Sequence, residues 1–166
     1  MEGCPSLVAT SLPGKDRWAL EEFMDTVMSA DPHVTVRETR YRGVFVAFSM
    51  REPGLLASKF LAFTHAFIAR VYPVLMCAEP SGLNDLVRAA ASALRGPVRL
   101  EVRIREPLSR MLSDDSVSQA AREAGLQISK SSRFLLVIES IEDHLLSSYG
   151  KQALCGPRCR VVLPMP

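Results

Sequence analysis

The sequence predicts a mixed α/β protein made of two small domains, and two patterns support this prediction. In the first half, strand-like and helix-like segments follow in the order β-α-β-β-α-β, the order of a ferredoxin-like sheet with two helices on one face. In the second half, an amphipathic helix, an alternating strand, a second helix and an apolar strand follow one another. The connection between the halves, residues 76–82, has turn residues and no periodicity. We therefore expect one domain at residues 1–75 and a second at residues 76–166.

The expected elements of the first half are strand Ser6–Thr10, a helix from Asp16 to Asp31-Pro32, strands Val34–Arg40 and Val44–Ser49, a helix from Glu52-Pro53, and strand Ile68–Val74. Leu20, Phe23, Met24, Val27 and Met28 form an apolar stripe on the first helix. Gly43 suits the tight turn between the two middle strands, because glycine tolerates positive φ. The end of the second helix stays open between Thr64 and Phe67.

The expected elements of the second half are helix Leu83–Leu94, strand Val98–Ile104, a helix capped by Asp114 or Asp115 and ended by Gly125, and strand Phe134–Ile138, with further candidate strands at Ile141–Ser147 and Arg160–Leu163. Strand Val98–Ile104 alternates, so one of its faces is apolar and the other is charged. Strand Phe134–Ile138 is apolar on both faces, as in a strand covered on both sides.

Composition predicts a globular protein that is not embedded in a membrane. The 166 residues are 48% hydrophobic, enough to bury a core. No apolar run approaches the roughly 20 residues that a membrane helix needs. The first residues, with Glu2 and no basic segment, do not resemble a secretory signal, so we expect a cytoplasmic protein with no membrane partner.

The net charge is only +2, but arginines are concentrated in two regions. The candidate RNA-contacting residues are Arg88, Arg95, Arg99, Arg103, Arg105 and Arg110 in the second half, and Arg40, Tyr41 and Arg42 at the tip of the first-half hairpin. Guanidinium groups suit phosphate oxygens, and Tyr41 could stack on an unpaired base. The alternative is that these arginines belong to ordinary solvated sheet faces.

The sequence shows no catalytic or metal-binding pattern, so we expect no catalytic residue, metal or cofactor. No Gly-x-Gly-x-x-Gly loop is present. Cys4 and Cys77 stand alone, and Cys155 and Cys159 are separated by three residues, which predicts a disulfide or idle thiols more than zinc. His65 lies in an apolar run and is interpreted as structural rather than as a ligand or base.

Four aromatic residues allow two interpretations. They are Trp18, Phe60, Phe63 and Phe67. Aromatic side chains at helical spacing usually belong to a core, although exposed rings could stack on bases.

The second half resembles the THUMP domain of RNA-modifying enzymes, in the segments 98–107, 124–126 and 134–139. The first half is similar to the ferredoxin-like domain that often precedes THUMP. Segments 7–10, 39–45 and 68–74 resemble stand-alone THUMP proteins related to the accessory factor for tRNA cytidine acetylation. The resemblance implies that the two domains together bind tRNA near the acceptor and 3′ end and present it to a separate modifying enzyme, with a tRNA cytidine acetyltransferase as one candidate. Because the sequence shows no catalytic constellation, we expect no enzymatic activity of the chain itself. Two alternatives remain, a small α/β enzyme or ligand-binding protein and a protein-protein adaptor.

Overall fold

A computed structural model describes residues 3–165, which divide into two compact units. The N-terminal unit consists of Gly3–Val74 and Gln152–Leu163. The central unit consists of Leu75–Lys151 and, within the described residues, 164–165. Each unit has its own hydrophobic core, and they are described in turn.

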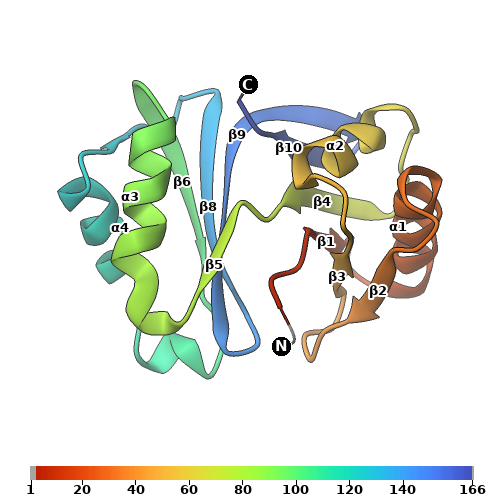
Figure 1. Cartoon of the computed structure of the whole chain (residues 1–166), viewed down its shortest axis with the longest axis horizontal. Helices are drawn as coiled ribbons and strands as arrows, with labels where there is room; N and C mark the ends of the chain where they lie inside the picture. The colour runs from red at the N-terminus through yellow and green to blue at the C-terminus, as the bar shows by residue number, and fades with distance from the viewer. Residues whose placement is uncertain (1–2, 166) are drawn as a thin grey trace. The chain divides into compact units, whose positions relative to one another are not determined.

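The N-terminal unit contains strand β1 (Leu7–Ser11), helix α1 (Asp16–Ala30), strands β2 (Thr35–Glu38) and β3 (Val44–Phe48), helix α2 (Pro53–Ser58), strand β4 (Ile68–Pro73) and strand β10 (Cys159–Leu163) (Figure 1). The predicted order β-α-β-β-α-β is confirmed. The strands lie in the order β2-β3-β1-β4-β10. Strand β1 is antiparallel to β3 and β4, whereas β10 is parallel to β4.

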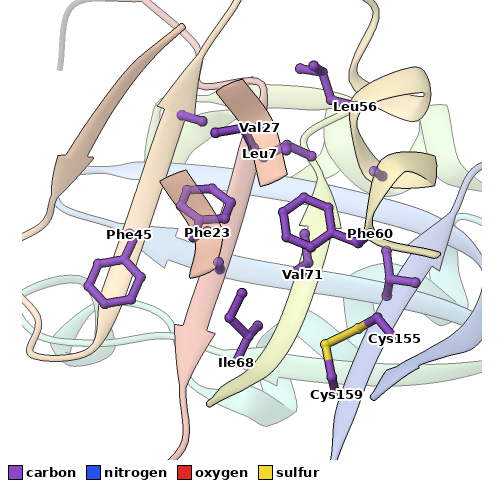
Figure 2. Close-up of a cluster of buried hydrophobic side chains, with 14 of the residues drawn as sticks. Leu7, Phe23, Val27, Phe45, Leu56, Phe60, Ile68, Val71, Cys155 and Cys159 are labelled. Carbon is purple, nitrogen blue, oxygen red and sulfur yellow. A yellow bond between two sulfur atoms is a disulfide. The ribbon is translucent and has the colours of Figure 1, made fainter. Parts of the chain in front are cut away.

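The core of this unit forms between the sheet and its helices. Figure 2 shows the Phe23 ring between the rings of Phe45 and Phe60, and Leu7 of β1 belongs to the same core. All four residues are buried, with exposed fractions of 1% or less. The second helix is short, since α2 ends at Ser58 and a 3₁₀ turn follows at Lys59–Leu61.

Residues 152–163 lie in the N-terminal unit, which differs from the expected second domain of residues 76–166. Strand β10 hydrogen-bonds to β4, with Val161 opposite Val71. Both valines are buried, as is the disulfide between Cys155 and Cys159. Residues 152–163 therefore complete this core, and burial of their apolar side chains is the reason that they pack here.

The central unit contains strand β5 (Met76–Ala78), helix α3 (Leu83–Ala93), strand β6 (Pro97–Arg103), helix α4 (Asp114–Glu123), and strands β7 (Gln127–Ile128), β8 (Phe134–Ile141) and β9 (His144–Gly156). The last residues of β9, from Gln152, lie in the N-terminal unit. The strand order is β9-β8-β6-β7, and β5 also pairs with β9. Strand β6 is parallel to β7 and β8, and α4 lies in the crossover connection. Apolar residues of α3, α4, β6 and β8 share one core.

Three local expectations in this unit differ from the structure. The connection after residue 75 contains the short strand β5, because its backbone pairs with β9. The cap of α4 is Ser113, whose hydroxyl accepts a hydrogen bond from Ser116 N at 3.1 Å, and the two aspartates lie in the first turn. The expected strand at Ile141–Ser147 is interrupted by a turn at Glu142, which has φ of 56°.

Candidate nucleic-acid interface

The charged residues of β6 neutralise one another in part. Arg99 Nη2 lies 3.5 Å from Glu101 Oε1, and Arg103 Nη2 forms an ion pair with Glu101 Oε2. The side chains of Arg99, Glu101 and Arg103 are 31%, 25% and 18% exposed. Two arginines therefore share one carboxylate, so a phosphate would have to compete with a built-in anion for them.

Arg105 is tied to the neighbouring strand. Its guanidinium forms an ion pair with Glu139 on β8, a carboxylate that is fully buried. Its backbone N donates to Ser140 Oγ at 2.6 Å, and its Nη1 donates to Ser140 O at 3.1 Å. Removing one partner of a buried ion pair is strongly destabilising, so we expect Arg105 to have a structural role here.

The other three arginines of the second-half set are exposed, and they differ in their partners. Arg88 lies 3.9 Å from Asp85, one turn earlier on α3, and Arg110 lies 2.7 Å from Glu106. Such surface pairs are weak. Arg95 follows α3 and has no hydrogen-bond or ion-pair partner among residues 3–165.

The hairpin tip between β2 and β3 is held by internal contacts. Gly43 has φ of 72°, so the turn needs a residue that tolerates positive φ. Arg42 Nε donates to Asp16 Oδ2 at 2.6 Å. The bonds from Arg42 and then from Ser11 lower the pKa of the Asp16 carboxyl, and the same pair raises the pKa of Arg42. Arg40 is exposed, whereas Tyr41 is half-buried.

Four cations without acidic partners lie at one end of the central sheet, which we call the basic end: Arg95, Lys130, Arg133 and Lys151. All four are exposed. None has an ion pair or side-chain hydrogen bond to any residue in the described range 3–165. Segments 95–98 and 129–134, which contain Arg95, Lys130 and Arg133, have no Asp or Glu, and Lys151 lies in strand β9. Such a cluster attracts phosphates without first breaking an internal ion pair.

Strand register brings these loops together. Ser132 Oγ donates to Pro97 O at 2.6 Å, which joins the loop before β8 to the loop before β6. Lys151 on β9 lies opposite Phe134 on β8, and Phe134 directly follows Arg133 in the chain. Three segments that are distant in sequence thus meet at one sheet end.

Of the four residues in the basic end, only Arg95 belongs to the set of RNA-contacting residues predicted from the sequence. Lys130 and Arg133 lie in the segment Ser-Lys-Ser-Ser-Arg, directly before an apolar strand. A basic, serine-rich loop at the start of a predicted strand was the available signal. Lys151 offered no comparable signal, because its position depends on the pairing of β9.

The aromatic residues fall into both predicted classes. Phe60 is fully buried, in agreement with a core role. Trp18 and Phe63 are about half exposed, at 49% and 50%. The rings of Trp18 and Phe67 lie 5.5 Å apart, and Lys15 Nζ lies 5.0 Å from the Trp18 ring. Trp18 is therefore an exposed ring that already has two partners.

His65 and the C-terminal cysteines form a buried structural cluster. Cys155 and Cys159 are joined by a disulfide, and Cys4 and Cys77, which stand alone in the sequence, are disulfide-bonded as well. His65 Nε2 lies 2.9 Å from Thr26 Oγ1, and its Nδ1 lies 2.9 Å from Cys155 O. The potential ligand atoms of His65, Cys155 and Cys159 lie within 4.8 Å of one another. Both sulfur atoms are joined in the disulfide, however, and both His65 ring nitrogens are in hydrogen bonds. The cluster does not fit a metal ion in this state.

No helix in the described part of the chain has the length and apolar character needed to cross a membrane.

The fold is similar to three solved structures. PH1313 from Pyrococcus horikoshii OT3 has a TM-score of 0.62 and 13% identity, and the match covers 89% of this chain and 54% of that one. TrmN from Thermus thermophilus has a TM-score of 0.54 and 16% identity, covering 86% of this chain and 44% of that one. A 4-thiouridine synthetase in complex with RNA and ATP has a TM-score of 0.54 and 12% identity, covering 98% of this chain and 44% of that one.

The likeness shows a THUMP-like α/β fold, as expected from the sequence. The chain spans about half the length of the solved structures that it matches. No protein-family model and no curated protein matches the sequence.

Proposed function

We propose that this chain binds tRNA near its acceptor and 3′ end and presents it to a separate RNA-modifying enzyme, with a tRNA cytidine acetyltransferase as the candidate partner. The observation that carries the proposal is the basic end, four exposed cations at one end of a THUMP-like sheet that have no ion-pair partner among residues 3–165. One of the similar structures, the 4-thiouridine synthetase, is an RNA complex. The proposal assigns binding to this chain and the chemistry to the partner.

The charge pattern supports an RNA ligand over a protein ligand. Lysine and arginine side chains that lack acidic partners neutralise phosphates, release counterions and give affinity without base specificity. Hydroxyl groups of Ser129, Ser131 and Ser132 lie in the same loop and suit additional phosphate or ribose contacts. A protein-protein adaptor would instead need a contiguous exposed apolar surface at its binding site.

Titration of tRNA binding against salt tests the binding step. We expect a linear fall of log K with log salt, and little difference among tRNA sequences, because phosphate contacts dominate. Tight binding that is insensitive to salt would contradict the proposal, as would the absence of tRNA binding at low salt.

Reconstitution tests the accessory role. Purified protein incubated with tRNA and methyl, acetyl or sulfur donors should form no modified nucleoside by itself. The candidate acetyltransferase should modify tRNA faster when this protein is added, and the increase should disappear with a variant that lacks the basic end. Formation of a modified nucleoside by the protein alone would overturn the accessory role.

A further inference from the structure

The N-terminal unit contains a second polar site that the RNA-binding surface above does not use. A cavity of about 560 Å³ lies where α1 ends and β3 ends, and its lining includes Asp31, His33, Phe48, Ser49, Met50 and Arg51. This volume is within the range of about 300–1,000 Å³ that is usual for small-molecule sites. All of these residues belong to one unit.

A buried carboxylate contributes hydrogen-bond acceptors to this cavity. Asp31 is the C-cap residue that follows α1, and only 7% of it is exposed. Its Oδ2 accepts a hydrogen bond from Ser49 Oγ at 2.5 Å, and its Oδ1 accepts one from His33 N at 2.9 Å. These two bonds, in that order, lower the pKa of Asp31, so the group remains an acceptor at neutral pH. Each oxygen retains capacity for another donor.

Apolar side chains line another part of the cavity. Phe48 is partly exposed, and the Arg37 guanidinium lies 4.8 Å from its ring centroid. Met50 is fully exposed, which is unusual for a side chain with this apolar character. An aromatic ring and a flexible thioether together suit a planar heterocycle.

Basic side chains complete the lining. Arg51 and His33 are exposed, and neither the guanidinium nor the imidazole ring has a hydrogen-bond or ion-pair partner among residues 3–165. A guanidinium group can hold a phosphate through two parallel hydrogen bonds. The cavity therefore combines acceptors for an amino group, apolar contacts for a ring and a cation for a phosphate.

We infer that this cavity binds a single unpaired nucleotide whose base has an exocyclic amino group. The amino group donates to Asp31, the base contacts Phe48 and Met50, and the phosphate contacts Arg51. Carboxylates accept from the cytosine amino group but find no donor at the corresponding keto oxygen of uracil. The inference rests on the proposed function in one respect: the bound tRNA would supply the unpaired nucleotide that enters the cavity.

The direct test compares cytidine 5′-monophosphate with uridine 5′-monophosphate by titration calorimetry on the full chain. Cytosine has an exocyclic amino group at the ring position where uracil has a keto oxygen, so the comparison isolates the contact to Asp31. We expect cytidine monophosphate to bind about tenfold more tightly, as one discriminating base contact provides. A methyl-labelled sample should show a shift of the Met50 signal on binding.

Variants separate the two contacts. Arg51→Gln should weaken both nucleotides by a similar factor and leave the amino preference unchanged, whereas Asp31→Asn should remove the preference. Arg158→Gln, a change at another exposed arginine, is the control and should alter neither affinity. If Asp31→Asn does not fold, the wild-type comparison and the Arg51 variant still decide the question.

Equal affinity for the two nucleotides, or no binding of either, overturns the inference. The salt titration of tRNA binding is independent of this result. Salt-dependent tRNA binding without any binding of cytidine monophosphate would refute only the cavity assignment. Selective binding of cytidine monophosphate without tRNA binding would support the cavity and refute the proposed function.

Discussion

Replacing the basic end with neutral residues is the sharpest test of the RNA-binding surface. The variant combines Arg95→Gln, Lys130→Gln, Arg133→Gln and Lys151→Gln. Glutamine keeps a long polar side chain and removes the charge. All four side chains are exposed and lack partners in the described range, so the fold should tolerate the changes, each within about 0.5 kcal/mol.

The expected magnitude follows from counterion release. Each cation that neutralises a duplex phosphate adds about 0.9 to the slope of log K against log salt. If all four contact phosphate, the variant should lose about 3.6 units of slope. Between about 50 and 200 mM salt, a fourfold increase, the wild-type affinity should then fall roughly 150-fold more than that of the variant.

The double variant Arg99→Gln and Arg103→Gln provides the matched comparison. These two arginines share the single carboxylate of Glu101, so the three side chains together carry a net charge of +1. We expect a loss of about one unit of slope, well below that of the basic-end variant. Arg105 is left unchanged, because its removal would leave the buried Glu139 without its ion-pair partner.

Fluorescence anisotropy with labelled tRNA at several salt concentrations measures both slopes, and thermal unfolding checks that each variant is folded. An unchanged slope in a folded basic-end variant would show that these cations do not contact phosphate. A larger loss of slope in the Arg99 and Arg103 variant would show that β6, not the basic end, is the principal surface.

Two further predictions concern stability. Arg42 lowers the pKa of Asp16 in the folded state, so the ionised Asp16 carboxylate stabilises the fold at neutral pH. This stabilisation is lost as the pH falls below the ordinary pKa of 3.8 and through the lower folded pKa. Asp16→Asn should therefore make stability less dependent on pH in the acid range, and an unchanged dependence would contradict the ion pair. Gly156→Ala should destabilise by about 3 kcal/mol in urea unfolding, because its Cβ would lie 2.1 Å from the His65 carbonyl oxygen. Gly96→Ala, which has φ of +81° and open space, should cost only about 1 kcal/mol, and equal losses at both sites would show that the close approach is absent.

The element order was predictable because it depends on local patterns. Alternation in the segment after Gly96 predicted β6. The apolar stripe on residues 20–28 predicted α1, although Met24 and Met28 of that stripe are exposed rather than buried. These periodicities reflect which side of each element is buried. Short elements gave weaker patterns, since β5 has three residues and α2 has six.

The candidate site was less predictable, because an arginine in a sequence does not reveal its partners. Arg99, Arg103 and Arg105 look alike in the alternating pattern, yet they are bound to Glu101 or to Glu139 in the structure. Glu139 lies 34 residues after Arg105, and only the parallel pairing of β6 with β8 brings their strands together. The availability of a charge is thus a property of strand register.

By itself, the sequence determined the α/β class, the β-α-β-β-α-β order of the first half and the general position of most helices and strands. Tertiary structure alone decided that residues 152–163 join the N-terminal core and that Arg95, Lys130, Arg133 and Lys151 meet at one sheet end. Periodicity records the burial of a single element, which is a local property of the chain. Pairing between distant strands depends on the packing of all elements together, and that packing determines which polar groups remain free to bind a ligand.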